Sequence, residues 1–340
     1  MTSLERVSLA LSHKEADRVP VYPILSGVSR LLTGASYYDF ARNPQVMADC
    51  MSAVTDKFDL DVICTLTDLS VEASDFGQEL DYPETEAAGP TSNRLIKDIE
   101  DYKKIKTIEL GPRMKENIEA CKILSAKYGN TKPLVAFVFG PLGILSMLRN
   151  QAEMFVDCYD EPEYIKGAVQ EIIGTLWVYC DKLLDAGCHA IMFDTLYASG
   201  SIMKKQMWKE LEGVYIEPLC EHIHKRGAMV MIHNCGNDIY FDAQIEYLKP
   251  EGISFLWPPD DCKDFAECKK KYGDVTTLIG CVNPTWLPHA TREEIMEECK
   301  REMDIMAPGG GFILATGCEY PANLSFDAAQ AMCDAAREYI

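Results

Sequence analysis

The sequence has no long hydrophobic run and no excess of positive charge. No window approaches the roughly 18 uncharged apolar residues that a membrane-spanning helix needs. The first residues show no basic stretch followed by an apolar segment, so we expect no secretory signal. Lys and Arg number 33 against 53 Asp and Glu, which gives a formal net charge of −20. A surface this acidic repels nucleic acids and anionic lipid headgroups, so we expect no nucleic-acid partner and no membrane contact.

The 14 cysteines show no compact, repeated spacing of the kind that a disulfide framework requires. A chain of 340 residues is also far larger than the small secreted domains that disulfides hold together. We therefore expect a reducing, cytoplasmic location, with most cysteines serving as small buried apolar residues. Hydrophobic residues make up 47% of the chain, and no repeat or low-complexity tract divides it. We expect a single domain over residues 1–340.

Eight short apolar runs, rich in β-branched residues, predict strands. They lack apolar/polar alternation, which is typical of parallel strands buried on both faces. Helical patterns separate most of them, as at 161–186, 204–226 and 292–306, and the last begins with the capping box Thr291 and Glu294. This alternation predicts an α/β fold, a (β/α)8 TIM barrel, with a doubly wound open sheet as the alternative. The predicted strands are 19–24, 60–64, 134–139, 190–194, 229–233, 253–256, 278–281 and 312–315.

One segment, about 66–130, departs from the alternation. It holds few strand-like runs, several turn signals and one helical pattern near 113–127. We interpret it as an insertion over the barrel mouth after the second strand, because the loops that follow barrel strands carry site residues. An excursion that never touches substrate is the alternative.

Potential metal ligands stand where two predicted strands end. His233 and Cys235 follow the run 229–233, and residues two apart on a strand point to the same side. Cys318 follows the run 312–315, and all strands of a parallel barrel end at one face. One imidazole and two thiolates suit Zn²⁺, and three protein ligands leave a fourth position for substrate. In a chain rich in cysteine, a chance His-x-Cys pair buried in the core is the alternative.

Other residues at predicted strand ends are candidates for substrate contact. Asp194 ends the fourth strand, where barrels place catalytic groups; it either acts on substrate or orients His233, and a loop-ordering role is the alternative. Tyr197 and Trp257 are candidates to line the pocket, or they only pack there. Asn283 follows the seventh strand and either contacts substrate or shapes its loop.

Around these residues the sequence resembles the uroporphyrinogen decarboxylase superfamily, and more closely its methylcobalamin:coenzyme M methyltransferase branch. The resemblance covers nearly the whole chain, and the His-x-Cys pair with a distant Gly-Cys looks like the zinc motif of that branch. The similar segments include Asp17-Arg-Val-Pro-Val21, Phe193-Asp194, His233-Asn-Cys-Gly236, Gly280-Cys-Val-Asn-Pro284 and Gly309 to Cys318.

The resemblance to the decarboxylases themselves is weaker at the first strand. Those enzymes carry an arginine-rich segment there that holds the porphyrin carboxylates, whereas this chain reads Leu25-Ser-Gly-Val-Ser-Arg30-Leu, with one arginine. A ligand with many carboxylates needs several forked cations. The similar cobalamin-independent methionine synthases add a glutamate ligand where Trp257 stands here. The fourth zinc position is therefore open to water, Asp260, Glu319 or no protein group.

The resemblance implies transfer of a methyl group between a corrinoid and a small thiol. Coordination to Zn²⁺ deprotonates a thiol, and the soft ligand set keeps its sulfur electron-rich, which suits alkyl transfer better than hydrolysis. No Asp-x-His-x-x-Gly segment is present to ligate cobalt from below. We therefore expect a methylcobamide carried by a separate corrinoid protein, or free in solution, with docking over the mouth near the 66–130 segment.

The acceptor in the similar methyltransferases is coenzyme M, whose sulfonate needs donors such as arginine. Arg30 is the arginine expected nearest the mouth, with Arg149 next, and surface positions are the alternative for both. Three other functions remain open. They are a corrinoid-dependent demethylase acting on a methoxylated or methylated donor, a metal-free uroporphyrinogen decarboxylase, and a binding module without turnover.

Overall fold

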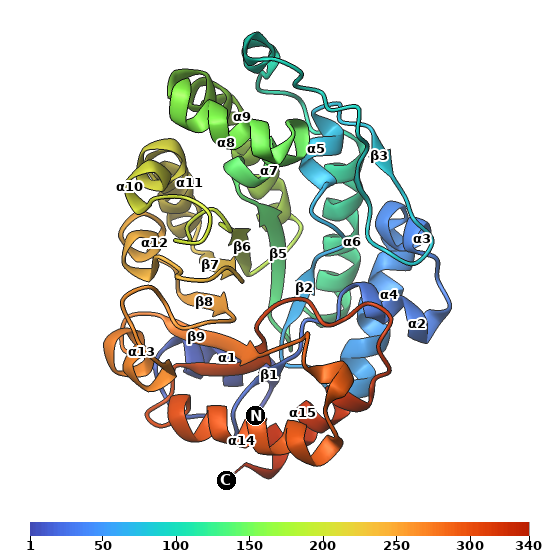
Figure 1. The fold of residues 1–340 in the computed structure, drawn as a ribbon. Helices are drawn as coiled ribbons and strands as arrows, with labels where there is room; N and C mark the ends of the chain where they lie inside the picture. The colour runs from blue at the N-terminus through green and yellow to red at the C-terminus, as the bar shows by residue number, and fades with distance from the viewer. Residues whose placement is uncertain (340) are drawn as a thin grey trace.

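Eight parallel strands form a nearly closed barrel at the centre of the computed structural model, which describes residues 1–339 (Figure 1). Around the barrel the order is β1-β10-β9-β8-β7-β6-β5-β2. Each barrel strand from β5 to β10 pairs in parallel with the next one along the chain, as expected for a (β/α)8 barrel. The barrel strands are β1 Val21–Tyr22, β2 Ile63–Thr65, β5 Leu134–Phe139, β6 Ala190–Asp194, β7 Met229–Asn234, β8 Gly252–Phe255, β9 Thr277–Val282 and β10 Phe312–Thr316.

The barrel is joined between β1 and β2 by Asp61. Its backbone N–H donates to the Val21 carbonyl at 3.1 Å, and its carboxylate accepts the Val21 N–H at 2.8 Å. Arg6 and Arg18 hold the same carboxylate at 2.7 and 2.6 Å. Since Asp61 has no exposed surface, a buried ion cluster occupies the place where a longer strand ladder would close the sheet.

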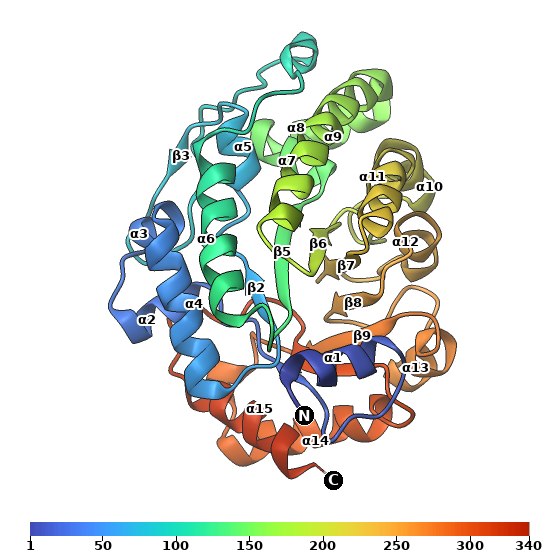
Figure 2. The ribbon, with the colours of Figure 1, turned by 180° about the vertical axis from the view of Figure 1, so that it is seen from behind.

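Helices form an outer ring around the strands (Figures 1 and 2). The N-terminal helix instead packs against the barrel interior through Val7 and Ala10, and covers the amino-terminal end of the barrel. The helices are α1 Ser3–Leu11, α2 Arg30–Thr33, α3 Tyr37–Arg42, α4 Pro44–Phe58, α5 Val71–Asp75, α6 Pro112–Tyr128, α7 Pro141–Leu148, α8 Gln151–Asp160, α9 Pro162–Asp185, α10 Lys205–Trp208, α11 Val214–Lys225, α12 Phe241–Leu248, α13 Phe265–Tyr272, α14 Arg292–Met306 and α15 Asp327–Glu338.

Two hydrophobic cores hold these layers together. The smaller core fills the barrel with residues such as Tyr22, Phe137 and Met231, and the larger one lies between strands and helices. Eleven of the 14 cysteines are buried, and all 14 are free thiols, as the lack of a disulfide spacing predicted. Across residues 1–339 no helix combines the length and apolar character needed to cross a membrane.

The predicted strands agree with the observed ones, and β5 and β6 match to the residue. The first strand is shorter than predicted, because Pro20 and Pro23 flank Val21–Tyr22 and lack the N–H that a ladder needs. One continuous helix was predicted over 204–226, and this prediction was wrong. A π-helical turn, Lys209–Gly213, separates α10 from α11. The capping box of α14 is present, with Thr291 and Glu294 bonded reciprocally.

The expected insertion over 66–130 divides in two. Its last part is α6, which packs between α4 and the strands β2 and β5 and so belongs to the outer ring. The earlier part carries α5, a short antiparallel pair of β3 Leu80–Asp81 and β4 Gly89–Pro90, and a 3-10 helix Ile99–Lys104. It lies along one side of the molecule in both ribbon views, and its Thr85 carbonyl accepts a hydrogen bond from Asn323 in the loop after β10.

Candidate metal centre

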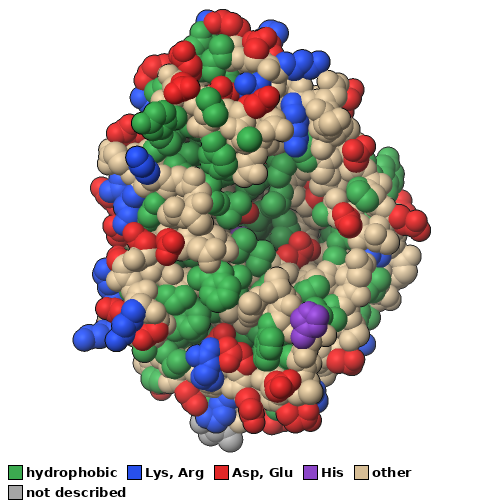
Figure 3. Space-filling model, viewed as in Figure 1, with side chains coloured by type: hydrophobic (Ala, Val, Ile, Leu, Met, Phe, Trp, Pro, Cys, Tyr) green, Lys and Arg blue, Asp and Glu red, His purple; other side chains and the backbone are tan. Residues whose placement is uncertain are grey.

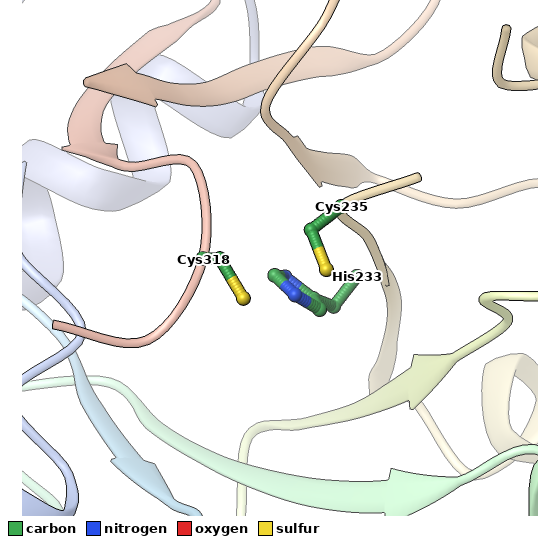
Figure 4. Close-up of side chains that lie close together, drawn as sticks. All are labelled: His233, Cys235 and Cys318. Atoms are coloured by element: carbon green, nitrogen blue, oxygen red, sulfur yellow. The ribbon is translucent and has the colours of Figure 1, made fainter. Parts of the chain in front are cut away.

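His233, Cys235 and Cys318 meet at the carboxyl-terminal end of the barrel (Figure 4). His233 lies in β7, Cys235 directly follows that strand, and Cys318 follows β10. Their ligand atoms all lie within 4.8 Å of one another. The imidazole lies between the two sulfur atoms in Figure 4, so the three donors face a common point. Figure 3 shows this face of the molecule hollowed at its centre, with hydrophobic and some acidic side chains around the hollow.

Local contacts fix the backbone beside His233, Cys235 and Cys318, so that the three side chains reach one another. Asn234, between the first two ligands, donates to the Thr195 and Ala198 carbonyls at 2.8 and 3.3 Å and accepts the Gly236 N–H at 3.0 Å. Gly317 lies so close to Leu256 that a Cβ there would meet the leucine at 2.6 Å. A larger residue at 317 would therefore push Cys318 away from the other two ligands.

The two thiols interact directly with each other and with His233. A hydrogen bond from Cys235 and the contact with His233 together lower the pKa of Cys318 to about 4, against the effect of burial. The same hydrogen bond, together with burial, raises the pKa of Cys235. Of the two thiols, Cys318 is therefore the more readily ionised, and thiolate is the form in which cysteine binds a metal.

His233 is oriented by Ser254, whose hydroxyl lies 3.0 Å from Nδ1 of the imidazole. Ser254 stands opposite His233 in the β7–β8 ladder and is fully buried. The aromatic ring of Phe137 lies near the imidazole, at 6.1 Å between centroids. The contact with Ser254 engages Nδ1 and leaves the other ring nitrogen, Nε2, available for a further partner.

Asp194 ends β6 and pairs in register with His233 on the neighbouring strand. Burial raises the pKa of its carboxyl to about 6, while the nearby His233 opposes the shift and Cys318 adds to it. One oxygen accepts the Leu196 N–H at 3.1 Å. Asp194 therefore lies against the ligand set, as its place at a strand end suggested, and it also orders its own loop.

Two carboxylates considered as a fourth ligand bind elsewhere. Glu319 accepts the Gly27 N–H at 2.8 Å, and burial raises the pKa of its carboxyl to about 7. Asp260 pairs with Lys205 at 3.0 Å and groups with Asp242 and Asp261 instead. Within residues 1–339 no carboxylate joins the three donors in one group.

The three remaining predicted residues, Tyr197, Asn283 and Trp257, differ in burial and in hydrogen bonding. Tyr197 is buried, with its hydroxyl accepting from Gln151 at 3.3 Å and its ring against Phe155. Asn283 accepts two hydrogen bonds from Thr285 and so shapes its own loop. Trp257 is 40% exposed and is the one of the three that presents a large surface to solvent.

Both arginines considered for an anionic substrate have partners in the fold. Arg30 stacks on the Tyr37 ring at 4.4 Å and donates to Asn323, while its buried Nε has no partner among residues 1–339. Arg149 donates to Asp157 at 2.9 Å and to the Lys97 carbonyl.

A buried ion pair near the mouth has no counterpart among the predicted site residues. Asp68, just beyond β2, accepts from Arg113 at 2.6 Å, and Arg113 also donates to the Tyr82 hydroxyl at 3.2 Å. Its position at a strand end is the same signal that drew attention to Asp194. Asp68 is balanced by its arginine and so anchors α6 to the rim.

Fold and site together define the class of protein: a (β/α)8 barrel with one nitrogen and two sulfur donors gathered where its strands end. The chain belongs to the uroporphyrinogen decarboxylase (URO-D) family, whose model matches residues 2–339. The resemblance inferred from the motifs is thereby confirmed.

Relatives within this family carry two kinds of name. The chain is 22% identical to a methylcobamide:CoM methyltransferase MtbA from Methanosarcina acetivorans, over 99% of this chain and 98% of that protein. It is 20% identical to a uroporphyrinogen decarboxylase from Hydrogenovibrio crunogenus, over 92% of this chain and 90% of that protein. A solved methyltransferase from Methanosarcina mazei shares the fold with a TM-score of 0.84, at 20% identity and 99% coverage of both chains. The chain therefore belongs to a family of enzymes.

Proposed function

We propose that this protein is a zinc-dependent methyltransferase that moves a methyl group between a corrinoid and a small thiol. The observation that carries the proposal is the convergence of His233, Cys235 and Cys318 at the barrel mouth, within 4.8 Å of one another. One imidazole and two thiolates suit Zn²⁺ in softness and number. Three protein ligands also leave a position for substrate, which is typical of a catalytic zinc site and not of a structural one.

The residues of the chain fit this ion in charge as well as in position. When bound, zinc would lower the pKa of a substrate thiol and so supply a nucleophilic sulfur. Nδ1 of His233 is engaged by Ser254, which leaves Nε2 available to the ion, and the contacts with Cys235 and His233 lower the pKa of Cys318. Asp194 lies beside the ligands, in register with His233, and we assign it the role of contacting the substrate.

The charges around the mouth favour methyl transfer over porphyrinogen decarboxylation. A substrate with many carboxylates would need several forked cations without other partners. Arg30 is tied to Tyr37 and Asn323, and Arg113 is neutralised by Asp68. The nearby Asp194 carboxyl, with a pKa of about 6, would add negative charge against an anionic ring system.

The corrinoid would be delivered by a partner. The sequence offers no Asp-x-His-x-x-Gly segment, and two of the relatives are named as methylcobamide:CoM methyltransferases. We therefore propose that a corrinoid protein docks over the hollowed face, beside the segment that precedes α6.

The proposal is tested on the purified full chain by metal analysis and by a methyl-transfer assay. We expect about one zinc per chain, from the single ligand set, and loss of the methylcobalamin absorption band when a thiol such as coenzyme M is added. Incubation with uroporphyrinogen, with and without a chelator, is the comparison. A zinc-free protein, or carbon dioxide release by the chelator-treated enzyme, would contradict the proposal.

Asp194→Asn is expected to keep zinc but to slow methyl transfer. A hydrogen bond to a charged group contributes about 1.5–3 kcal/mol, so kcat/KM should fall about 10- to 100-fold. Steady-state kinetics with methylcobalamin and thiol give kcat and KM separately. Asp238→Asn, an exposed change in the loop after Cys235, is the control. Unchanged kinetics in Asp194→Asn would mean that Asp194 does not contact the substrate and only orders its loop through the hydrogen bond from Leu196.

A further inference from the structure

Only one of the two ring nitrogens of His233 is free to bind a metal ion. Nδ1 lies 3.0 Å from the Ser254 hydroxyl oxygen, and the ligand atoms of His233, Cys235 and Cys318 lie within 4.8 Å of one another. Since Nδ1 is engaged by the serine, Nε2 is the nitrogen left available for an ion. Which nitrogen carries the proton then decides whether this histidine is a ligand at all.

Ser254 is placed by the strand ladder itself. It lies in β8, directly across from His233 in the parallel register, and the two side chains point to the same face of the sheet. Ser254 has no exposed surface, so water does not compete for its hydroxyl. The contact is therefore fixed by rigid elements and not by a loop.

We infer that Ser254 is a positioning residue that stabilises the metal-binding form of His233. When Nδ1–H donates to the Ser254 oxygen, the lone pair of Nε2 points at the ion. In the opposite arrangement the serine donates to Nδ1, Nε2 carries the proton, and no ligand remains. The Ser254 oxygen would stabilise the first arrangement by accepting the Nδ1–H, and so would keep Nε2 available as a ligand. This inference rests on the metal centre of the proposed function.

A serine performs this task without adding charge. Metal-bound histidines often donate their second N–H to a carboxylate, which increases the negative charge of the site. Asp194 flanks His233 on the other side of the ladder, but its recorded hydrogen bond is with Leu196. Two thiolates already neutralise a divalent ion, so a neutral partner for His233 keeps the open position favourable for an anionic sulfur.

Ser254→Ala should bind zinc about 10- to 100-fold more weakly than the parent, the range found when the hydrogen-bond partner of a ligand is removed. Ser254→Thr keeps the hydroxyl and should restore most of the affinity. The matched control is Thr277→Val, which removes another fully buried strand hydroxyl, one that donates to Ala10 at 3.1 Å far from the ligands. Zinc dissociation constants come from competition with a chromophoric chelator, and zinc-edge X-ray absorption reports the share of nitrogen ligands.

The outcomes separate this inference from the proposed function. Equal zinc affinity in the parent and Ser254→Ala, or an equal loss in Thr277→Val, would overturn the role of Ser254 alone. Tight zinc binding by a parent that transfers no methyl group would contradict only the proposed function. A parent that binds no zinc would overturn both.

Discussion

Cys318→Ala is expected to release zinc and to abolish methyl transfer. Removing the hydrogen-bond partner of a metal ligand costs about 10- to 100-fold in affinity, and removing the ligand itself should cost more than about 100-fold. The remaining pair, His233 and Cys235, comes from one strand end and cannot surround an ion from opposite sides. Zinc content after gel filtration and loss of the methylcobalamin band with thiol are the two measurements.

Another partly exposed cysteine serves as the control for this change. Cys262 is also partly buried, but its thiol lies 3.4 Å from an Asp261 oxygen and belongs to no candidate ligand set. Cys262→Ala should keep both zinc and activity, and urea unfolding of both variants should stay near that of the parent. A Cys318→Ala protein with stoichiometric zinc and normal turnover would refute the metal centre as described.

The barrel and the convergence of His233, Cys235 and Cys318 were predictable from the sequence because both follow from simple periodic rules. Apolar runs separated by helical patterns predict a parallel barrel, and parallel strands end on one face, so residues far apart such as Cys235 and Cys318 were expected to meet. The first strand was predicted too long, since flanking prolines limit its ladder to Val21–Tyr22. The π-helical turn before α11 was also missed, because apolar spacing does not reveal one added residue.

Contacts between side chains were harder to predict. A serine inside a strand carries no motif, and only the register of β7 against β8 brings Ser254 to His233. Arg30 was expected near the mouth from its place after the first strand. Its guanidinium stacks on Tyr37 and donates to Asn323, from a loop almost 300 positions later in the chain, and neither partner was predicted. Such pairings depend on tertiary packing, which no local pattern records.

Asp61→Asn is expected to destabilise the whole barrel by about 3–5 kcal/mol, the range for breaking a buried ion pair at one partner. The carboxylate is fully buried and binds Arg6, Arg18 and the Val21 N–H, all at 2.8 Å or less. A neutral amide carries no charge, so Arg18 loses its charged partner, while Arg6 keeps only the more exposed Asp17. The amide also weakens the join between β1 and β2, on which closure of the sheet depends.

The matched control removes the other carboxylate that binds Arg6. Asp17 accepts from Arg6 at 2.7 Å, but its side chain is 41% exposed. Solvent therefore screens this ion pair, and Asp17→Asn should lower the free energy of unfolding by at most about 1 kcal/mol. Free energies of unfolding from urea titrations, with fluorescence and circular dichroism as independent probes, compare the two variants. Similar losses in both would mean that Arg6 is stabilised by its packing alone and that Asp61 does not hold the barrel closed.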